Sequence, residues 1–462
     1  MQGLNSQQPG DSTPESLGGQ RYVVLGLFSN FELRGFPGRI HSSRAVGETL
    51  NSGQNASGND EYSDRSHIDV KYESDMQKLR RDSSDAMLEV PLPNTARSAT
   101  TSKADMISAS LERQSEDVSV SAYRSMSAPR TEKFAKLLDE KIVDIEQLRE
   151  LSWSGIPPEF RPVCWRLLLG YVPPNRDLRE QVLIRKRKEY KNFVPDYYDS
   201  IAAISNISDV SGISQASDEE NAFRQVVVDV PRTAPNVPFF HQSRIQKSLE
   251  RILLIWGIRH PASGYVQGIN DLATPFLAVF TSERHCSSSI DNVNVNILSD
   301  GEILDIEADS YWCLCKLLDG IQDHYTYAQP GIQRTLFHVE ELVSRVEGSI
   351  AKHFSLEGVH YMQFAFRWVN CLLLRELPFN LGIRIWDTYL SEGPALKDFL
   401  IYVLSSFLLS WAPELREKDF QGIIMFLQHC PTEGWTEREI ELVLSRAFMW
   451  RVSFKDALSH FS

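Results

Sequence analysis

The tryptophan and cysteine residues of this 462-residue chain are confined to its C-terminal two thirds. All nine tryptophans lie at or after Trp153 and all six cysteines at or after Cys164, whereas residues 1–130 hold 22 serines, 14 basic and 17 acidic residues. A segment so poor in large apolar groups cannot offset the entropy lost when its backbone is ordered. The sequence therefore predicts a mostly disordered N-terminal region over residues 1–128, in which the apolar run within 21–40 is a candidate docking element, and a folded domain over residues 129–460.

Apolar residues in the predicted domain recur at the spacing of α-helices. Phe134, Leu138, Ile142 and Ile145 follow one another every three or four residues, and Asp144 is a candidate cap for a new helical turn. Further patterns of this kind lie at about 245–256, 269–280, 309–325, 333–353, 359–376, 380–391, 395–411, 417–429 and 436–447. The pattern predicts an all-α fold.

Few segments interrupt this helical pattern. The only β-branched run is Gln-Val-Val-Val-Asp-Val at 225–230, and Pro231 ends it. Polar stretches at about 200–221 and 283–305 are typical of long surface loops. The basic run at 185–188 is typical of the solvated face of a helix, with a nuclear signal or a patch for an acidic partner as alternatives.

The composition excludes several classes of protein. The net charge of −13, from 48 basic and 61 acidic residues, argues against a general nucleic-acid binder, which needs a basic face to meet phosphates. The six cysteines are too sparse for a disulfide scaffold and lack a CxxC spacing, so reduced thiols in a cytoplasmic protein are expected. No targeting signal is found and no apolar stretch reaches about 18 residues, so no membrane span is expected. The GxxxxGK[ST] loop is absent, which argues against binding of nucleotide phosphates by the chain alone, and the enzyme motifs GxGxxG, HExxH and GxSxG are absent as well.

Three short motifs follow one another along the predicted domain. They are Arg161-x-x-x-Trp165, Val226-x-x-Asp229-x-x-Arg232 and Tyr265-x-Gln267. Taken singly each is weak, because an Arg four residues before a Trp is usually a cation resting on a packed ring, and an Asp three residues before an Arg is usually a local ion pair. Together they resemble the signature motifs of the TBC domain of Rab GTPase-activating proteins, with Val226 in place of the usual Ile.

The text around the third motif, residues 259–271, is similar to the subgroup that contains the fungal Golgi Ypt/Rab activator and its animal relatives. The resemblance covers about 130–460, with a signature core at 153–390. It implies a two-lobed, multi-helix domain and a GTP-bound Rab as partner. It also implies a cytoplasmic protein recruited peripherally to Golgi or other endomembranes.

By the same resemblance, Arg232 is an arginine finger and Gln267 a glutamine finger supplied in trans. The chain is then a GTPase activator with no cofactor of its own, because the hydrolase, the GTP and the Mg²⁺ belong to the Rab. We expect Asp229 to hold Arg232 or its loop, and Tyr265 to brace the loop of Gln267. Arg161 and Trp165 are expected to organise the floor between helices, while Trp386 and Asp387 are expected to be core and helix-capping residues.

The chemistry of GTP hydrolysis explains why these residue types are needed. Negative charge spreads over the γ-phosphoryl group in the transition state, and the planar fork of an arginine bridges two oxygens while staying cationic. The group that aligns the attacking water needs a donor and an acceptor without a net charge beside phosphate, and the amide of a glutamine has both.

Two alternatives stay open at this point. The first is an adaptor that binds Rab proteins without catalysis, and the second is a phospho-regulated scaffold that acts through its N-terminal region. The run Arg124-Ser125-Met126-Ser127-Ala128-Pro129 fits the pattern that 14-3-3 proteins recognise, with Ser127 as the candidate phosphosite.

Overall fold

The computed structural model describes residues 129–203, 217–284, 290 and 293–458, all of which belong to the compact unit Thr101–Ser462. The predicted disordered region, the apolar run within 21–40 and Ser127 lie outside the described residues. Within the described residues the fold is helical, without a β-strand, and a single antiparallel bridge joins Ile142 to Asn175. The prediction of an all-α fold is therefore confirmed.

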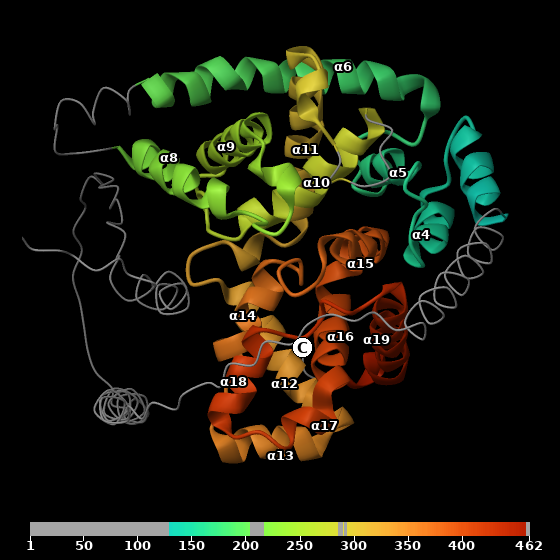
Figure 1. Ribbon diagram of the computed structural model, residues 1–462. Helices are drawn as coiled ribbons and strands as arrows, with labels where there is room; N and C mark the ends of the chain where they lie inside the picture. Colours follow the sequence, from blue (N-terminus) through green and yellow to red (C-terminus); the bar gives the residue numbers. More distant parts are fainter. Residues whose placement is uncertain (1–128, 204–216, 285–289, 291–292, 459–462) are drawn as a thin grey trace, which may run out of the picture. The chain divides into compact units, whose positions relative to one another are not determined.

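Figure 1 shows two groups of helices in this unit. The upper group, coloured cyan to yellow, contains a helix over 129–139, α4 (Ile145–Trp153), α5 (Arg161–Leu168), α6 (Arg176–Phe193), α8 (Asp218–Asp229), α9 (Ser243–Arg259), α10 (Ile269–Arg284) and α11 (Asp300–Gly320). The lower group, coloured orange to red, contains α12 (Pro330–Val346), α13 (Gly348–Glu357), α14 (Met362–Asn370), α15 (Phe379–Glu392), α16 (Leu396–Leu408), α17 (Ala412–Leu415), α18 (Phe420–Gln428) and α19 (Glu437–Leu458). Helix α15 contacts α4 and α5 of the upper group as well as α16 and α19, so it joins the two groups.

The first apolar stripe belongs to two helices. The helix over 129–139 stops before Ile142, whose side chain is 63% exposed, and α4 starts afresh behind Asp144. The Asp144 carboxylate accepts hydrogen bonds from the main-chain N–H groups of Glu146 and Gln147 at 3.0 and 3.2 Å. The predicted cap is thus confirmed, and the expected place of Ile142 in the apolar stripe is wrong because the chain turns there.

The expected polar loops are shorter than the sequence suggested. Helix α8 already begins at Asp218, where Ser217 caps it, and α11 begins at Asp300 behind a capping box formed by Ser299 and Glu302. The β-branched run 225–230 lies mostly in α8. Its side chains at Val226 and Val230 are buried on one face, so packing overrides the strand preference of valine.

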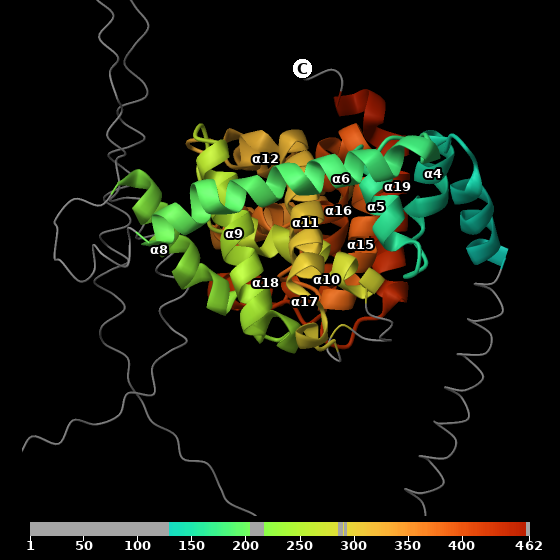
Figure 2. The same ribbon diagram turned by 90° about the horizontal axis from the view of Figure 1, so that it is seen from above.

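Helix α6 crosses over the upper group, as seen from above in Figure 2. The expectation that its basic run is a solvated face is wrong for two of the four residues. Arg187 donates to the buried Asp309 of α11 at 2.7 and 3.0 Å, and Lys186 lies 3.7 Å from the ring centre of Trp312. These contacts hold α6 against α11.

One part of the lower group is apolar and long enough to cross a membrane by length and composition, Phe379–Leu415. It comprises α15, α16 and α17, with a break at Gly393, whose φ is +54°. Of its most apolar window, 78% is buried inside the protein. Its apolarity is therefore accounted for by the core of the domain.

Candidate functional site

Arg232 stands at the end of a short 3-10 turn, Val230–Arg232, that follows α8 directly. Its Nε donates to Asp229 Oδ1 at 3.0 Å, and its Nη2 donates to the same oxygen. The Asp229 side chain is fully buried, while the Arg232 side chain is 50% exposed. The buried carboxylate thus binds one edge of the guanidinium group and leaves the rest of it on the surface, in agreement with the expectation that Asp229 holds Arg232.

Asp229 also links this turn to the segment between α9 and α10. Tyr265 Oη donates to Asp229 Oδ2 at 2.8 Å, and Gln225 Nε2 lies 3.2 Å from both carboxylate oxygens. Burial and the neighbouring Asp229 carboxylate raise the pKa of Tyr265 well above its usual value, so the phenol stays a neutral donor. Tyr265 therefore braces the Gln267 segment against the Arg232 turn.

Gln267 lies on that segment with a partly exposed side chain. Its main-chain carbonyl accepts a hydrogen bond from Asn370 Nδ2 of α14 at 3.0 Å. The next residue, Gly268, has φ +110°, and a Cβ there would lie 2.1 Å from Asn370 Nδ2. Only glycine fits this position, which explains why a glycine directly follows Gln267.

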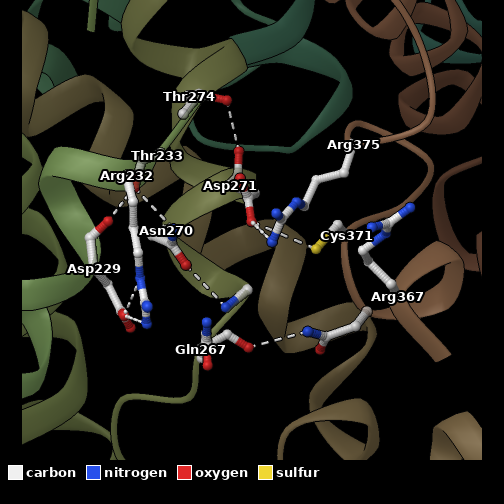
Figure 3. Close-up of polar contacts among 12 residues, drawn as sticks. Asp229, Arg232, Thr233, Gln267, Asn270, Asp271, Thr274, Arg367, Cys371 and Arg375 are labelled. Carbon is white, nitrogen blue, oxygen red and sulfur yellow. Dashed lines mark hydrogen bonds and ion pairs between the residues drawn. The ribbon is translucent and has the colours of Figure 1, made fainter. Parts of the chain in front are cut away.

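Figure 3 shows Arg232 and Gln267 on two neighbouring segments, with Asn270 between the segments that hold them. Asn270 Nδ2 donates to Thr233 Oγ1 at 2.8 Å, and Asn270 Oδ1 accepts from the Gly268 N–H at 2.8 Å. Sequence reasoning assigned no role to Asn270, Thr233 or Asn370. The signal available in the sequence was weak, an asparagine three residues after Gln267.

A buried carboxyl lies directly behind this pair of segments. Asp271 is 6% exposed and faces Cys371 Sγ at 3.5 Å and Arg375 Nη1 at 4.0 Å. Burial raises the pKa of Asp271, and the arginine offsets this only in part. Leu372 and Leu373 nearby adopt φ values of +48° and +64°, an unfavourable conformation for leucine, and both side chains are buried in the core.

Arg161 and Trp165 are placed elsewhere, around Asp387 of α15. Arg161 donates to the two carboxylate oxygens at 2.9 to 3.2 Å, Trp165 Nε1 donates at 2.8 Å, and the Ile156 N–H donates at 2.9 Å. The expected role of these two residues in organising the floor between helices agrees with these contacts. The expectation that Asp387 caps a helix is wrong, because it lies inside α15 and is fully buried. Trp386 lies in the core as expected.

A family model described as the Rab-GTPase-TBC domain matches residues 158–415. The chain belongs to this family. All three motifs of the TBC domain lie inside the matched range, and the predicted resemblance is confirmed.

Two relatives and one solved structure illustrate the likeness of this TBC protein. TBC1 domain family member 22B of Homo sapiens is 48% identical over 333 residues, which cover 72% of this chain and 63% of that protein. The GTPase-activating protein gyp1 of Schizosaccharomyces pombe is 43% identical over 353 residues, covering 76% of this chain and 66% of that protein. The crystal structure of the Ypt/Rab-GAP domain of Gyp1p matches with a TM-score of 0.65 and 44% identity, and covers 71% of this chain and 98% of that chain. This chain therefore spans 63–66% of the length of the two relatives.

The site of this TBC domain offers the guanidinium of Arg232 and the neutral amide of Gln267 on two neighbouring segments (Figure 3). Among the described residues, no three His, Cys, Asp or Glu side chains are grouped so as to hold a metal ion. A guanidinium and an amide of this kind can provide positive charge and hydrogen bonds to a bound partner.

Proposed function

We propose that this chain is a GTPase-activating protein for Rab-family GTPases and that Arg232 and Gln267 act in trans on the GTP held by the Rab. The observation that supports this most is the placement of Arg232. Its side chain is half exposed although the carboxylate that holds it is fully buried. A surface arginine fixed from behind is suited to enter another protein's nucleotide site.

Asp229 leaves part of the guanidinium fork of Arg232 for the nucleotide. Nε and one donor of Nη2 are taken by Asp229 Oδ1. The donors on Nη1 and the second donor on Nη2 then bridge two oxygens at the γ-phosphoryl group, where the transition state gathers negative charge. The buried carboxylate also balances the charge of the arginine before the Rab arrives.

Gln267 aligns the attacking water in this proposal. The Asn370 hydrogen bond at 3.0 Å and the tight packing at Gly268 fix the main chain on both sides of its carbonyl, while its side chain stays partly exposed. The amide oxygen accepts a hydrogen bond from the water and the amide nitrogen donates a hydrogen bond to the Rab. The Rab keeps its Mg²⁺ and GTP, so this chain needs no cofactor and the Rab is the hydrolase.

The relatives support this partner. One is named a GTPase-activating protein, and the solved structure is that of a Ypt/Rab-GAP domain. The sequence resemblance to the Golgi activators favours a cytoplasmic protein that reaches Golgi or other endomembranes through its Rab and thereby regulates vesicle traffic.

The test is single-turnover GTP hydrolysis by a panel of GTP-loaded Rabs with the full-length chain. Arg232→Ala should lower the stimulated rate by about 10³–10⁵-fold. Arg232→Lys should be nearly as damaging because an ammonium does not bridge two oxygens. Gln267→Ala should also be severe, and a Rab whose own catalytic glutamine is replaced by Leu should still respond to the wild-type chain.

Different results would favour the alternatives. Binding to GTP-loaded Rabs without stimulation would indicate an adaptor. A Rab mutant that is wholly unresponsive at saturating activator would refute glutamine supply in trans. If residues 129–462 were as active as the full chain in vitro yet failed to replace it in cells, the scaffold reading of the N-terminal region would gain support.

We also propose that phosphorylated Ser127 binds a 14-3-3 protein. The proposal rests on the sequence at 124–129 alone. Phosphate adds about −1.5 to −2 charge, which an arginine cluster can clamp. Recovery of 14-3-3 from cells should be lost after phosphatase treatment and in Ser127→Ala, and equal recovery with both forms would refute it.

A further inference from the structure

We propose that Asn270 is a positioning residue that ties the segment of Arg232 to the segment of Gln267, so that the two catalytic side chains keep a fixed separation. This inference rests on the proposed function for its kinetic consequence. Its structural part, the coupling of the two segments, stands on the contacts of one amide group.

The first contact of Asn270 is with the residue after Arg232. Asn270 Nδ2 donates to Thr233 Oγ1 at 2.8 Å, and Thr233 Oγ1 donates to the main-chain carbonyl of Asp229 at 3.0 Å. Thr233 and Asn270 are 1% and 5% exposed, so water does not compete for these bonds. The Thr233 hydroxyl thus stabilises the turn that carries Arg232, and it also fixes the position of this turn relative to Asn270.

The second contact is with the residue after Gln267. Asn270 Oδ1 accepts from the Gly268 N–H at 2.8 Å and from Tyr265 Oη at 3.3 Å. The orientation of the amide follows from its neighbours. The Gly268 N–H needs an acceptor, which is Asn270 Oδ1. The Thr233 hydroxyl already donates its hydrogen bond to the Asp229 carbonyl, so its oxygen accepts from a donor, which is Asn270 Nδ2.

Neither aspartate nor serine meets both requirements at this position. Aspartate lacks the donor that faces Thr233, and serine has too short a reach to meet two segments that are 35 residues apart in the chain (Thr233 to Gly268). The contacts of Asn270 join the turn after α8 to the start of α10, both in the upper helix group. Asn370 of α14, in the lower group, binds the main-chain carbonyl of Gln267. Loss of the Asn270 link therefore leaves the Arg232 turn joined to the Gln267 segment through the bond of Tyr265 to Asp229, without releasing Gln267 from α14.

The Thr233 hydroxyl offers a clean way to cut the link. Thr233→Val keeps the shape of the side chain and removes both hydroxyl bonds, whereas Thr233→Ser keeps the hydroxyl. The matched control is Thr281→Val on the same helix as Asn270, because Thr281 is fully buried and its hydroxyl has no partner among the described residues.

The first measurement is hydrogen exchange of the Gly268 amide in the full-length chain. Without an acceptor at Thr233, Asn270 turns away and Gly268 loses protection. We expect exchange about five- to tenfold faster in Thr233→Val, as for loss of one neutral hydrogen bond, and wild-type exchange in Thr233→Ser and Thr281→Val. Unchanged exchange in Thr233→Val would overturn the coupling, whether or not any Rab responds to the chain.

The second measurement is stimulated GTP hydrolysis, resolved into kcat and KM. If Arg232 is displaced in Thr233→Val, kcat should fall by about 10- to 100-fold while KM for the Rab stays unchanged. Thr233→Ser should restore the wild-type kcat. A loss that appears in KM, or that also appears in Thr281→Val, would overturn the positioning role. If the wild-type chain stimulates no Rab, the proposed function is rejected, and the exchange measurement still decides the coupling.

Discussion

Removing the Asp387 carboxylate tests whether Arg161 and Trp165 are structural. In Asp387→Ala three donors lose their acceptor: the Arg161 guanidinium, Trp165 Nε1 and the Ile156 N–H. Trp165 is fully buried and the Arg161 side chain is 17% exposed, so neither is readily rehydrated. The variant should therefore fold but be much less stable.

The size of the loss follows from these contacts. Breaking one partner out of a buried ion pair costs about 3–5 kcal/mol, and each other buried donor left unmet costs about 1–3 kcal/mol. These terms overlap, because water enters the space that the carboxylate leaves. We expect a loss of about 5 kcal/mol in the free energy of unfolding, or a fall of about 10 °C in Tm at about 2 °C per kcal/mol.

The assay is thermal unfolding together with GTP hydrolysis at a temperature where both forms are folded. The matched control is Asp300→Ala, since Asp300 also pairs with an arginine, Arg244, at 2.6 Å but is 97% exposed. The control should shift Tm by no more than about 2 °C. An Asp387→Ala variant with normal Tm and no activity would refute the structural role and place Arg161 or Trp165 in catalysis.

Three further predictions concern binding and pH. Val228→Asp, at a valine that is 60% exposed one turn before Arg232, should raise KM for the Rab about tenfold. Met449→Asp, at a methionine that is 62% exposed on α19, should leave KM unchanged, and titration with the Rab checks both expectations. Asp271→Asn should raise Tm at pH 7, because burial raises the pKa of Asp271 and the folded state favours its neutral form. The gain in Tm should vanish as the pH falls toward about 4, the usual pKa of an aspartate. A gain in Tm that persists at that pH would contradict this explanation. Burial lowers the pKa of His324 to about 4, so its contribution to stability should be lost as pH falls from about 6.5 to about 4, by about 2–3 kcal/mol, and His324→Leu should flatten the dependence of Tm on pH in that window.

The helical fold was predictable because its helices are long and strongly periodic. The stripes over 245–256 and 269–280 correspond to α9 and α10, and the pattern at 436–447 marks the start of α19. The sequence patterns were misleading where tertiary packing determines the local structure. The run at 225–230 has strand-forming residues, yet its burial against neighbouring helices keeps most of it in α8. Ile142 fits a helical stripe, yet the chain turns away at that point.

The site was predictable only in part for a related reason. Asp229 stands three residues before Arg232, so their ion pair is local and visible in the sequence. The contacts of Asn270 with Thr233 and of Asn370 with Gln267 join residues 37 and 103 positions apart. Nothing in the spacing of single residues indicates such pairs. The same holds for Asp387, which meets Arg161 across 226 positions.

The ion pair between Arg232 and Asp229 has a consequence for the thermodynamics of association. A free arginine side chain has about 2 kcal/mol of rotamer entropy, which is lost when the side chain is immobilised in a complex. Because Asp229 already restrains Nε and Nη2, part of this entropy is given up when the domain folds. In the proposed complex with a Rab, the entropic penalty of immobilising Arg232 is correspondingly smaller. Asp229→Ala should then make the measured entropy of binding less favourable even where the affinity changes little.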